Sequence, residues 1–309
     1  MPITIFPTLN LLARPGRTPP VVRYARTGSA TRIDATGALV AVPADVARHD
    51  FERAGGVYRG WRLEGPRTNL VLNSLAPAGQ TLTLAAGTYT LSLAGGGSVA
   101  ATGVLSGTAT EAAPLTQTVA AGTTTLSLTG DVRGLQLESG AYATSIIPTG
   151  GSQVTRAAEA ARVDAADFPL KADEGTLYVQ CSTAGHGGLQ TALELGDGGE
   201  NNRIVLRFDS ARAPQAAIFA GGTSQLALTA APVAAHQTVR MALAYRAGSA
   251  AFCVDGGAVL TAAPGTIPTA ASLWLGSEGT ITDPLNGHIM HAAYFPRRLA
   301  DADLQLLTR

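Results

Sequence analysis

Several kinds of residue are scarce in this sequence of 309 residues, and each scarcity excludes a class of protein. Charged residues make up only 14% of the chain and the formal net charge is zero. A neutral chain lacks the dense cationic surface that nucleic-acid binding requires, so nucleic acid is not an expected partner. There are only two cysteines, Cys181 and Cys253, which are too few for a disulfide framework. Both lie in apolar, strand-like segments, so buried free thiols are expected, although a bridge between them stays open.

Long apolar runs are also missing. No run reaches the length of a membrane-spanning helix, so membrane insertion is not expected. The first ten residues, MPITIFPTLN, lack the basic start and long apolar centre of a signal peptide. We therefore expect the protein to be synthesised and kept soluble in the cytoplasm, and to leave by a route other than secretion if it acts outside the cell.

The residues that are abundant indicate an all-β protein. Hydrophobic residues make up 46% of the chain but aromatic residues only 5%, and there are 36 glycines. Many short apolar runs separated by Gly and Thr are typical of strands joined by tight turns. The length favours two domains preceded by an arm, and the pattern of short strands makes β-sandwiches of both. A neutral surface lacks the usual electrostatic protection against self-association, which favours a homo-oligomer.

Changes in composition along the chain predict five segments. Residues 1–20 hold five prolines and form an extended N-terminal arm, which either docks on a partner or stays a flexible tail. Alternation of apolar residues between 80 and 93 predicts strands. Asp255-Gly256 and Asn286-Gly287 predict hairpin turns, and residues 299–307 predict a short terminal helix. The predicted segments are the docking arm 1–20, a small β module 21–68, a first sandwich 69–149, a linker 150–163 and a second sandwich 164–309.

Two phrases carry a resemblance to a known class of protein. The segment 63–74, LEGPRTNLVLNS, resembles the junction in bacteriophage spike and fibre proteins that leads into a carbohydrate-binding-like β-sandwich. The segment 135–149, LQLESGAYATSIIPT, resembles the end of that sandwich. The order of strands and turns in residues 164–309 is similar to a concanavalin-A-like, laminin-G-like jelly roll.

The resemblance implies a virion protein of a tailed phage or a phage-like gene-transfer particle. Such a protein would be a head spike or a tail fibre that binds host surface polysaccharide. Its N-terminal arm would attach it to other virion proteins, and several copies would act together. It would leave the cell inside an assembled particle. The alternatives are a purely structural decoration or adaptor protein of the virion, and a polysaccharide depolymerase.

Aromatic side chains are the candidates for sugar contact, because the face of a ring packs against the C–H groups of a pyranose. Each of them is also a plausible core residue, since a single aromatic residue in a strand is commonly buried. Trp274 lies between two leucines, so either the tryptophan or the leucine pair faces the core. The candidate ligand-binding residues are Tyr89, Tyr142, Trp274 and Tyr294.

Two oxygen-rich turns are the candidate metal site, with calcium as the possible cofactor. Laminin-G-like sandwiches often bind calcium at the rim, and hard cations prefer carboxylate and amide oxygens. The alternative is that these side chains hold only the backbone of their own turns. The candidate calcium ligands are Asp197, Glu200 and Asn201 in one turn, and Asp283 and Asn286 in the other.

No arrangement of residues indicates catalysis, so we expect a protein that is not an enzyme. A glycosidase needs two carboxylates at a fixed separation, and no Glu-x-Asp-x-Glu strand is present. There is no Gly-x-Ser-x-Gly motif, and the five histidines lack zinc-ligand spacing. The acidic residues considered for catalysis are Glu194, Asp197, Glu200, Asp209, Glu278 and Asp283.

Overall fold

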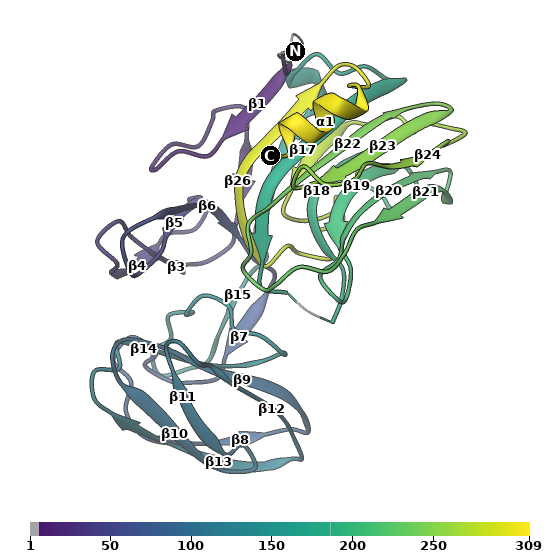
Figure 1. Cartoon of the computed structure of the whole chain (residues 1–309). Helices are drawn as coiled ribbons and strands as arrows, with labels where there is room; N and C mark the ends of the chain where they lie inside the picture. The colour runs from purple at the N-terminus through teal and green to yellow at the C-terminus, as the bar shows by residue number, and fades with distance from the viewer. Residues whose placement is uncertain (1–5, 186) are drawn as a thin grey trace. The chain divides into compact units, whose positions relative to one another are not determined.

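The computed structural model describes residues 6–185 and 187–309 (Figure 1). The first five residues of the predicted docking arm lie outside the described residues, as does His186. The regular elements of the described chain are almost all β-strands, which confirms the all-β prediction. None of its helices is long and apolar enough to cross a membrane. The chain forms two compact units, each assembled from separate stretches of sequence.

The larger unit contains residues up to Ala25, Tyr58–Gly65 and Glu159–Arg309. Its strands are β1 Leu9–Leu12, β2 Arg23–Ala25, β6 Tyr58–Leu63, β16 Ala160–Asp164, β17 Glu174–Thr183, β18 Gln190–Gly196, β19 Arg203–Phe208, β20 Pro214–Ala220, β21 Thr223–Thr229, β22 Val239–Arg246, β23 Ser249–Val254, β24 Leu260–Ala262, β25 Ser272–Leu275 and β26 Gly287–Phe295. A 3-10 turn, Ala165–Asp167, and the helix α1, Asp301–Leu307, complete it.

These strands form two antiparallel sheets. One sheet has the order β24-β23-β22-β17-β26, and both β1 and β6 pair with the remaining edge of β26. The other has the order β2-β16-β25-β18-β19-β20-β21. Alternate residues of each sheet meet in one core, for example Leu177 and Phe252 from the first sheet and Leu206 and Phe208 from the second. Each such fully buried side chain contributes about 1.5–3 kcal/mol of transfer free energy.

The helix α1 covers the outer face of the first sheet. Leu299 and Leu304 pack there against Tyr178, Ala242 and Cys253, in a second and smaller cluster. Acidic residues at the start of the helix match the positive end of its dipole. The terminal helix predicted from the sequence is confirmed.

The smaller unit contains Arg26–Val57 and Pro66–Ala158. Its strands are β3 Ala30–Ile33, β4 Leu39–Val42, β5 Arg48–Phe51, β7 Arg67–Asn69, β8 Gln80–Leu84, β9 Gly87–Ala94, β10 Ser98–Gly103, β11 Gly107–Thr110, β12 Leu115–Val119, β13 Gly122–Thr129, β14 Gly134–Ser139 and β15 Val154–Arg156. The sheets β11-β10-β13-β8 and β12-β9-β14 enclose a core that includes Leu84, Leu91, Leu93 and Leu137. The alternation between residues 80 and 93 therefore has the predicted structure.

The two units divide the segment 21–68, which the sequence predicts as one module. Strand β6 belongs to the larger unit because its residues 61–63 pair with β26. Strand β7 belongs to the smaller unit because it pairs with β15. Part of the predicted arm belongs to the larger unit, because β1 pairs with β26 and buries Leu9 and Leu11 in the core. Pairings between residues distant in sequence, rather than changes in composition, define these units.

Candidate functional site

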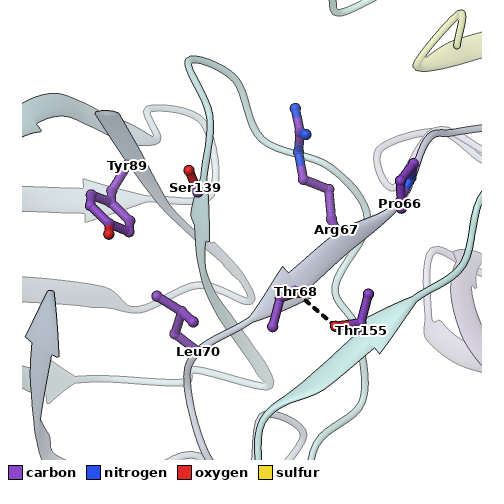
Figure 2. Close-up of a pocket in the computed structure, with 7 residues that line it drawn as sticks. All are labelled: Pro66, Arg67, Thr68, Leu70, Tyr89, Ser139 and Thr155. Carbon is purple, nitrogen blue, oxygen red and sulfur yellow. Dashed lines mark hydrogen bonds between the residues drawn. The ribbon is translucent and has the colours of Figure 1, made fainter. Parts of the chain in front are cut away.

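An open pocket with a volume of about 440 Å³ lies in the smaller unit (Figure 2). It combines one aromatic ring, several hydroxyl groups and one arginine. It is lined by Pro66, Arg67, Thr68, Leu70, Tyr89, Ser139 and Thr155. Figure 2 shows Arg67 and Tyr89 on opposite sides of Ser139.

Two pairs of strands build the walls of this pocket. Tyr89 follows the inward alternation of β9, and Ser139 lies directly opposite it, where the β9–β14 ladder ends. Thr68 on β7 is paired with Thr155 on β15, and their hydroxyl oxygens lie 2.7 Å apart. Leu70, which follows β7, adds an apolar side chain. The pocket thus lies between the end of the β9–β14 ladder and the β7–β15 pair.

The guanidinium group of Arg67 is fixed by three neighbours. Its Nε lies 3.3 Å from Oε2 of Glu138, and its central carbon lies 5.1 Å from the centre of the Tyr142 ring. A Cβ placed on Gly140 would lie only 3.0 Å from Nη2 of Arg67, which is closer than an ordinary van der Waals contact. A glycine at this position therefore makes room for the guanidinium group. Gly140 also has a φ of +137°, which other residues rarely adopt. About a quarter of the Arg67 side chain remains exposed.

Glu138, the ionic partner of Arg67, is fully buried and already hydrogen-bonded. Its Oε1 accepts hydrogen bonds from the backbone N–H of Thr144 at 2.7 Å and from Nε2 of Gln136 at 2.8 Å. Its Oε2 accepts one from the Thr144 hydroxyl at 2.8 Å. Burial raises the pKa of Glu138, while these hydrogen bonds and the charge of Arg67 oppose the rise. The carboxyl group of Glu138 thus faces Arg67 from the buried side and is shared with Gln136 and Thr144.

Two of the four predicted aromatic residues meet at this site. Tyr89 lines the pocket but is only 8% exposed, so its ring forms part of the wall and is not a free stacking platform. Tyr142 is half-buried beside Arg67. Arg67 was not predicted as a site residue. It lies within the segment 63–74 that resembles phage fibres, but nothing local in the sequence indicates its contact with Tyr142.

The other two aromatic residues lie in the larger unit. Leu273 and Leu275 face the core, so Trp274 points to the opposite face of its sheet, where Arg162 lies 5.3 Å from its ring and only 8% of the residue is exposed. Tyr294 is fully buried in the core, and its hydroxyl donates to the carbonyl oxygen of Glu174 at 3.1 Å. A ring without exposed surface cannot stack on a sugar, so Tyr294 is a packing residue instead of the predicted ligand contact.

The predicted calcium ligands lie in two turns of the larger unit. Asp197 accepts hydrogen bonds from the N–H of Gly199 and the side chain of Asn202, each at 2.9 Å. Asn286 accepts one from the N–H of Gly65 at 2.9 Å. The remaining predicted ligands are Glu200 and Asn201, which are exposed, and Asp283, which is half-buried. Within residues 6–185 and 187–309, no three His, Cys, Asp or Glu side chains are grouped to hold a metal. Calcium binding here stays a prediction.

Three of the acidic residues considered for catalysis gather around one arginine. Nη1 of Arg203 lies 2.5 Å from Oε2 of Glu278 and 3.6 Å from Oε2 of Glu194. The charges of Glu278 and Arg203 also act on Asp283, whose pKa is raised chiefly by burial. Glu194 and Glu278 are 1% and 2% exposed, which leaves no surface for a substrate to reach them. Arg203, Glu194 and Glu278 therefore form a buried ion-pair network.

No protein-family model matches the sequence, and no curated protein matches it significantly. Among solved structures, the CBM40 of the Ruminococcus gnavus IT-sialidase has 18% sequence identity and a TM-score of 0.39, over 45% of this chain and 84% of that one. The same module bound to alpha2,3 sialyllactose has a TM-score of 0.40. The NanB sialidase from Streptococcus pneumoniae has 14% identity and a TM-score of 0.40, over 48% of this chain and 26% of that one.

Proposed function

We propose that the protein binds carbohydrate in the pocket between Arg67 and Tyr89. The observation that carries the proposal is the composition of that pocket. A sugar ring has apolar C–H faces and a rim of hydroxyl groups. The pocket offers Leu70 and the small exposed part of Tyr89 to the apolar faces, and hydroxyl and guanidinium groups to the rim. The volume of about 440 Å³ is within the range of small-ligand sites.

We further propose that the protein is a spike or fibre on a phage or phage-like particle, and that it adheres to host surface polysaccharide. The support is the resemblance of segments 63–74 and 135–149 to phage fibre proteins. These same segments supply five of the seven residues that line the pocket: Pro66, Arg67, Thr68, Leu70 and Ser139. Several copies on one particle would add weak individual contacts into firm adhesion.

Attachment to the particle would use the part of the N-terminal arm that is not already packed. Leu9 and Leu11 lie in the core of the larger unit, and β1 is paired with β26. The following turn, which contains Arg14 and Arg17, is mostly exposed. We propose that this exposed stretch contacts other virion proteins.

We propose that the pocket holds its glycan without cleaving it. Glycoside hydrolysis commonly requires two carboxylates on either side of the scissile bond. The seven described residues that line the pocket include no aspartate or glutamate. Release of reducing ends from a bound polysaccharide would contradict this and favour the depolymerase alternative.

The test is to obstruct the pocket without opening a cavity. Thr155 is exposed at the pocket, so Thr155→Trp fills the pocket from its rim. Thr125 is the matched control, because it is also an exposed strand threonine in the smaller unit, with its hydroxyl 2.9 Å from that of Thr81. Binding to immobilised host surface polysaccharide is measured by biolayer interferometry.

We expect Thr155→Trp to weaken binding about tenfold or more, and Thr125→Trp to leave it unchanged. Equal binding by Thr155→Trp and the unmodified protein would place the glycan elsewhere. Failure of the unmodified protein to bind any polysaccharide would refute carbohydrate binding and leave the decoration or adaptor role.

A further inference from the structure

We infer that the pocket takes an acidic saccharide, and that the guanidinium group of Arg67 binds the saccharide's carboxylate. This inference rests on the proposed carbohydrate binding and deepens it by naming the class of sugar. Three features of Arg67 support it: its available hydrogen-bond donors, its charge and its fixed position.

The donors of Arg67 are available to a ligand. A guanidinium group has five N–H donors in a planar fork that matches the two oxygens of a carboxylate. Among the residues that the structure describes, none accepts a hydrogen bond from this side chain. Its Nε is buried beside Oε2 of Glu138, 3.3 Å away, so the donors left to a ligand are those of the two terminal nitrogens. A ligand carboxylate would supply acceptors that the protein itself does not.

The charge of the pocket favours an anion. Arg67 is the only charged residue among the seven described residues that line it. Glu138 lies behind Arg67, fully buried, and its oxygens already accept three hydrogen bonds from Gln136 and Thr144. The exposed side of the guanidinium group therefore keeps a positive potential toward the pocket.

Arg67 is held in place before any ligand arrives. The Tyr142 ring lies against the guanidinium group, and Gly140, which has no side chain, leaves room for the guanidinium group. An arginine that is already ordered loses less conformational entropy on binding than a free surface arginine. The hydroxyls of Ser139 and Thr155 lie at the same pocket and can bind the hydroxyl groups of the sugar.

The experiment compares one polysaccharide in two forms. The first is a capsular polysaccharide that contains uronic acid, and the second is the same polymer after chemical reduction of its carboxyl groups to alcohols. Both are titrated against the unmodified protein, Arg67→Gln and Arg133→Gln. Arg133 is the matched control, because it is an exposed arginine of the same unit that is paired with Asp131 at 2.6 Å.

We expect the unmodified protein and Arg133→Gln to bind the acidic form about tenfold or more tightly than the reduced form, and Arg67→Gln to lose this preference. Equal binding of the two forms by the unmodified protein would overturn the inference while leaving carbohydrate binding intact. If the unmodified protein bound neither form of the polysaccharide, that result would instead count against the proposed function. The comparison on the unmodified protein remains decisive if Arg67→Gln does not fold.

Free glucuronate and inorganic phosphate are added as competitors to identify the anion. Displacement by glucuronate supports a carboxylate site. Displacement by phosphate but not by glucuronate would overturn the inference, because it would assign Arg67 to a phosphate group.

Discussion

Replacement of Glu194 by glutamine should change the stability of the larger unit in a way that depends on pH. Glu194 is 1% exposed on β18, and its Oε1 accepts a hydrogen bond from the N–H of Gly279 at 2.9 Å. Burial raises its pKa to about 7, and the neighbouring Glu278 adds to the rise, while Gly279 and Arg203 oppose it. Arg203 is closer to Glu278 than to Glu194, so its charge stabilises the ionised form of Glu194 less strongly than that of Glu278.

The sign follows from proton binding. The ordinary pKa of this carboxyl group is 4.5, so between pH 4.5 and about 7 the folded state holds a proton that the unfolded state has lost. The free energy of unfolding therefore falls as pH rises through this window. One pKa unit corresponds to about 1.4 kcal/mol, so the loss between pH 5 and pH 8 is about 2–3 kcal/mol. Glutamine does not ionise and escapes this loss.

The assay is urea unfolding at pH 5 and pH 8, followed by tryptophan fluorescence. Trp61 and Trp274, the two tryptophans of the chain, both lie in the larger unit and report on it. The difference in free energy of unfolding between Glu194→Gln and the unmodified protein should shift in favour of the variant by about 2–3 kcal/mol from pH 5 to pH 8. This corresponds to about 5–10 °C in Tm. An equal difference between the two proteins at both pH values would refute the reasoning.

Glu174→Gln is the control of opposite sign. Glu174 accepts hydrogen bonds from Nζ of Lys171 at 2.8 Å and from the N–H of Arg298 at 3.1 Å, which lower its pKa. Its contribution to stability is present above its unfolded pKa and is lost as pH falls through the lower folded value. Glu174→Gln should therefore cost more at pH 8 than at low pH.

Three further outcomes are expected. Cys181 and Cys253 are both free and buried, and burial raises the pKa of Cys181, so an aromatic disulfide reagent should label neither thiol until the protein is unfolded; rapid labelling of the folded protein would contradict this. Gly287→Ala should lower Tm strongly or prevent folding, because its Cβ would collide with a backbone carbonyl of β17, whereas Gly150→Ala meets nothing within 4 Å and should be tolerated. Calcium bound at the predicted rim turns should raise Tm relative to protein in EDTA, and Asp283→Asn should remove the rise; an unchanged Tm would contradict calcium binding.

Short-range patterns in the sequence predicted the regular elements well. Leu84, Leu91 and Leu93 of β8 and β9 share one core, and Ile204, Leu206 and Phe208, at every second position of β19, lie in the other, as the spacing predicted. β23 and β24 pair across Asp255-Gly256 as predicted, and β26 begins at Gly287, but no hairpin forms at Asn286-Gly287 because β25 and β26 lie in different sheets. The confirmed predictions hold because side-chain alternation and positive backbone φ angles depend only on neighbouring residues.

The candidate site could be predicted only in part. Tyr89 and Tyr142 could be named as rings on strand-like segments, but the sequence did not indicate that Arg67 lies against one and near the other. Tyr294 illustrates the opposite failure. Its strand pattern allows an exposed ring, and only the packing of two sheets places it in the core.

The sequence by itself determined that the chain forms short strands, tight turns and one terminal helix, because these follow from the spacing of apolar residues and from glycine. Only the tertiary structure decided which strands pair across the chain, which face of each strand is covered, and which charged groups are neighbours. Those outcomes depend on contacts between segments far apart in sequence, such as β7 with β15 and Arg67 with Glu138. No local pattern encodes such contacts, because their free energy arises from joint burial of surfaces that meet only after folding.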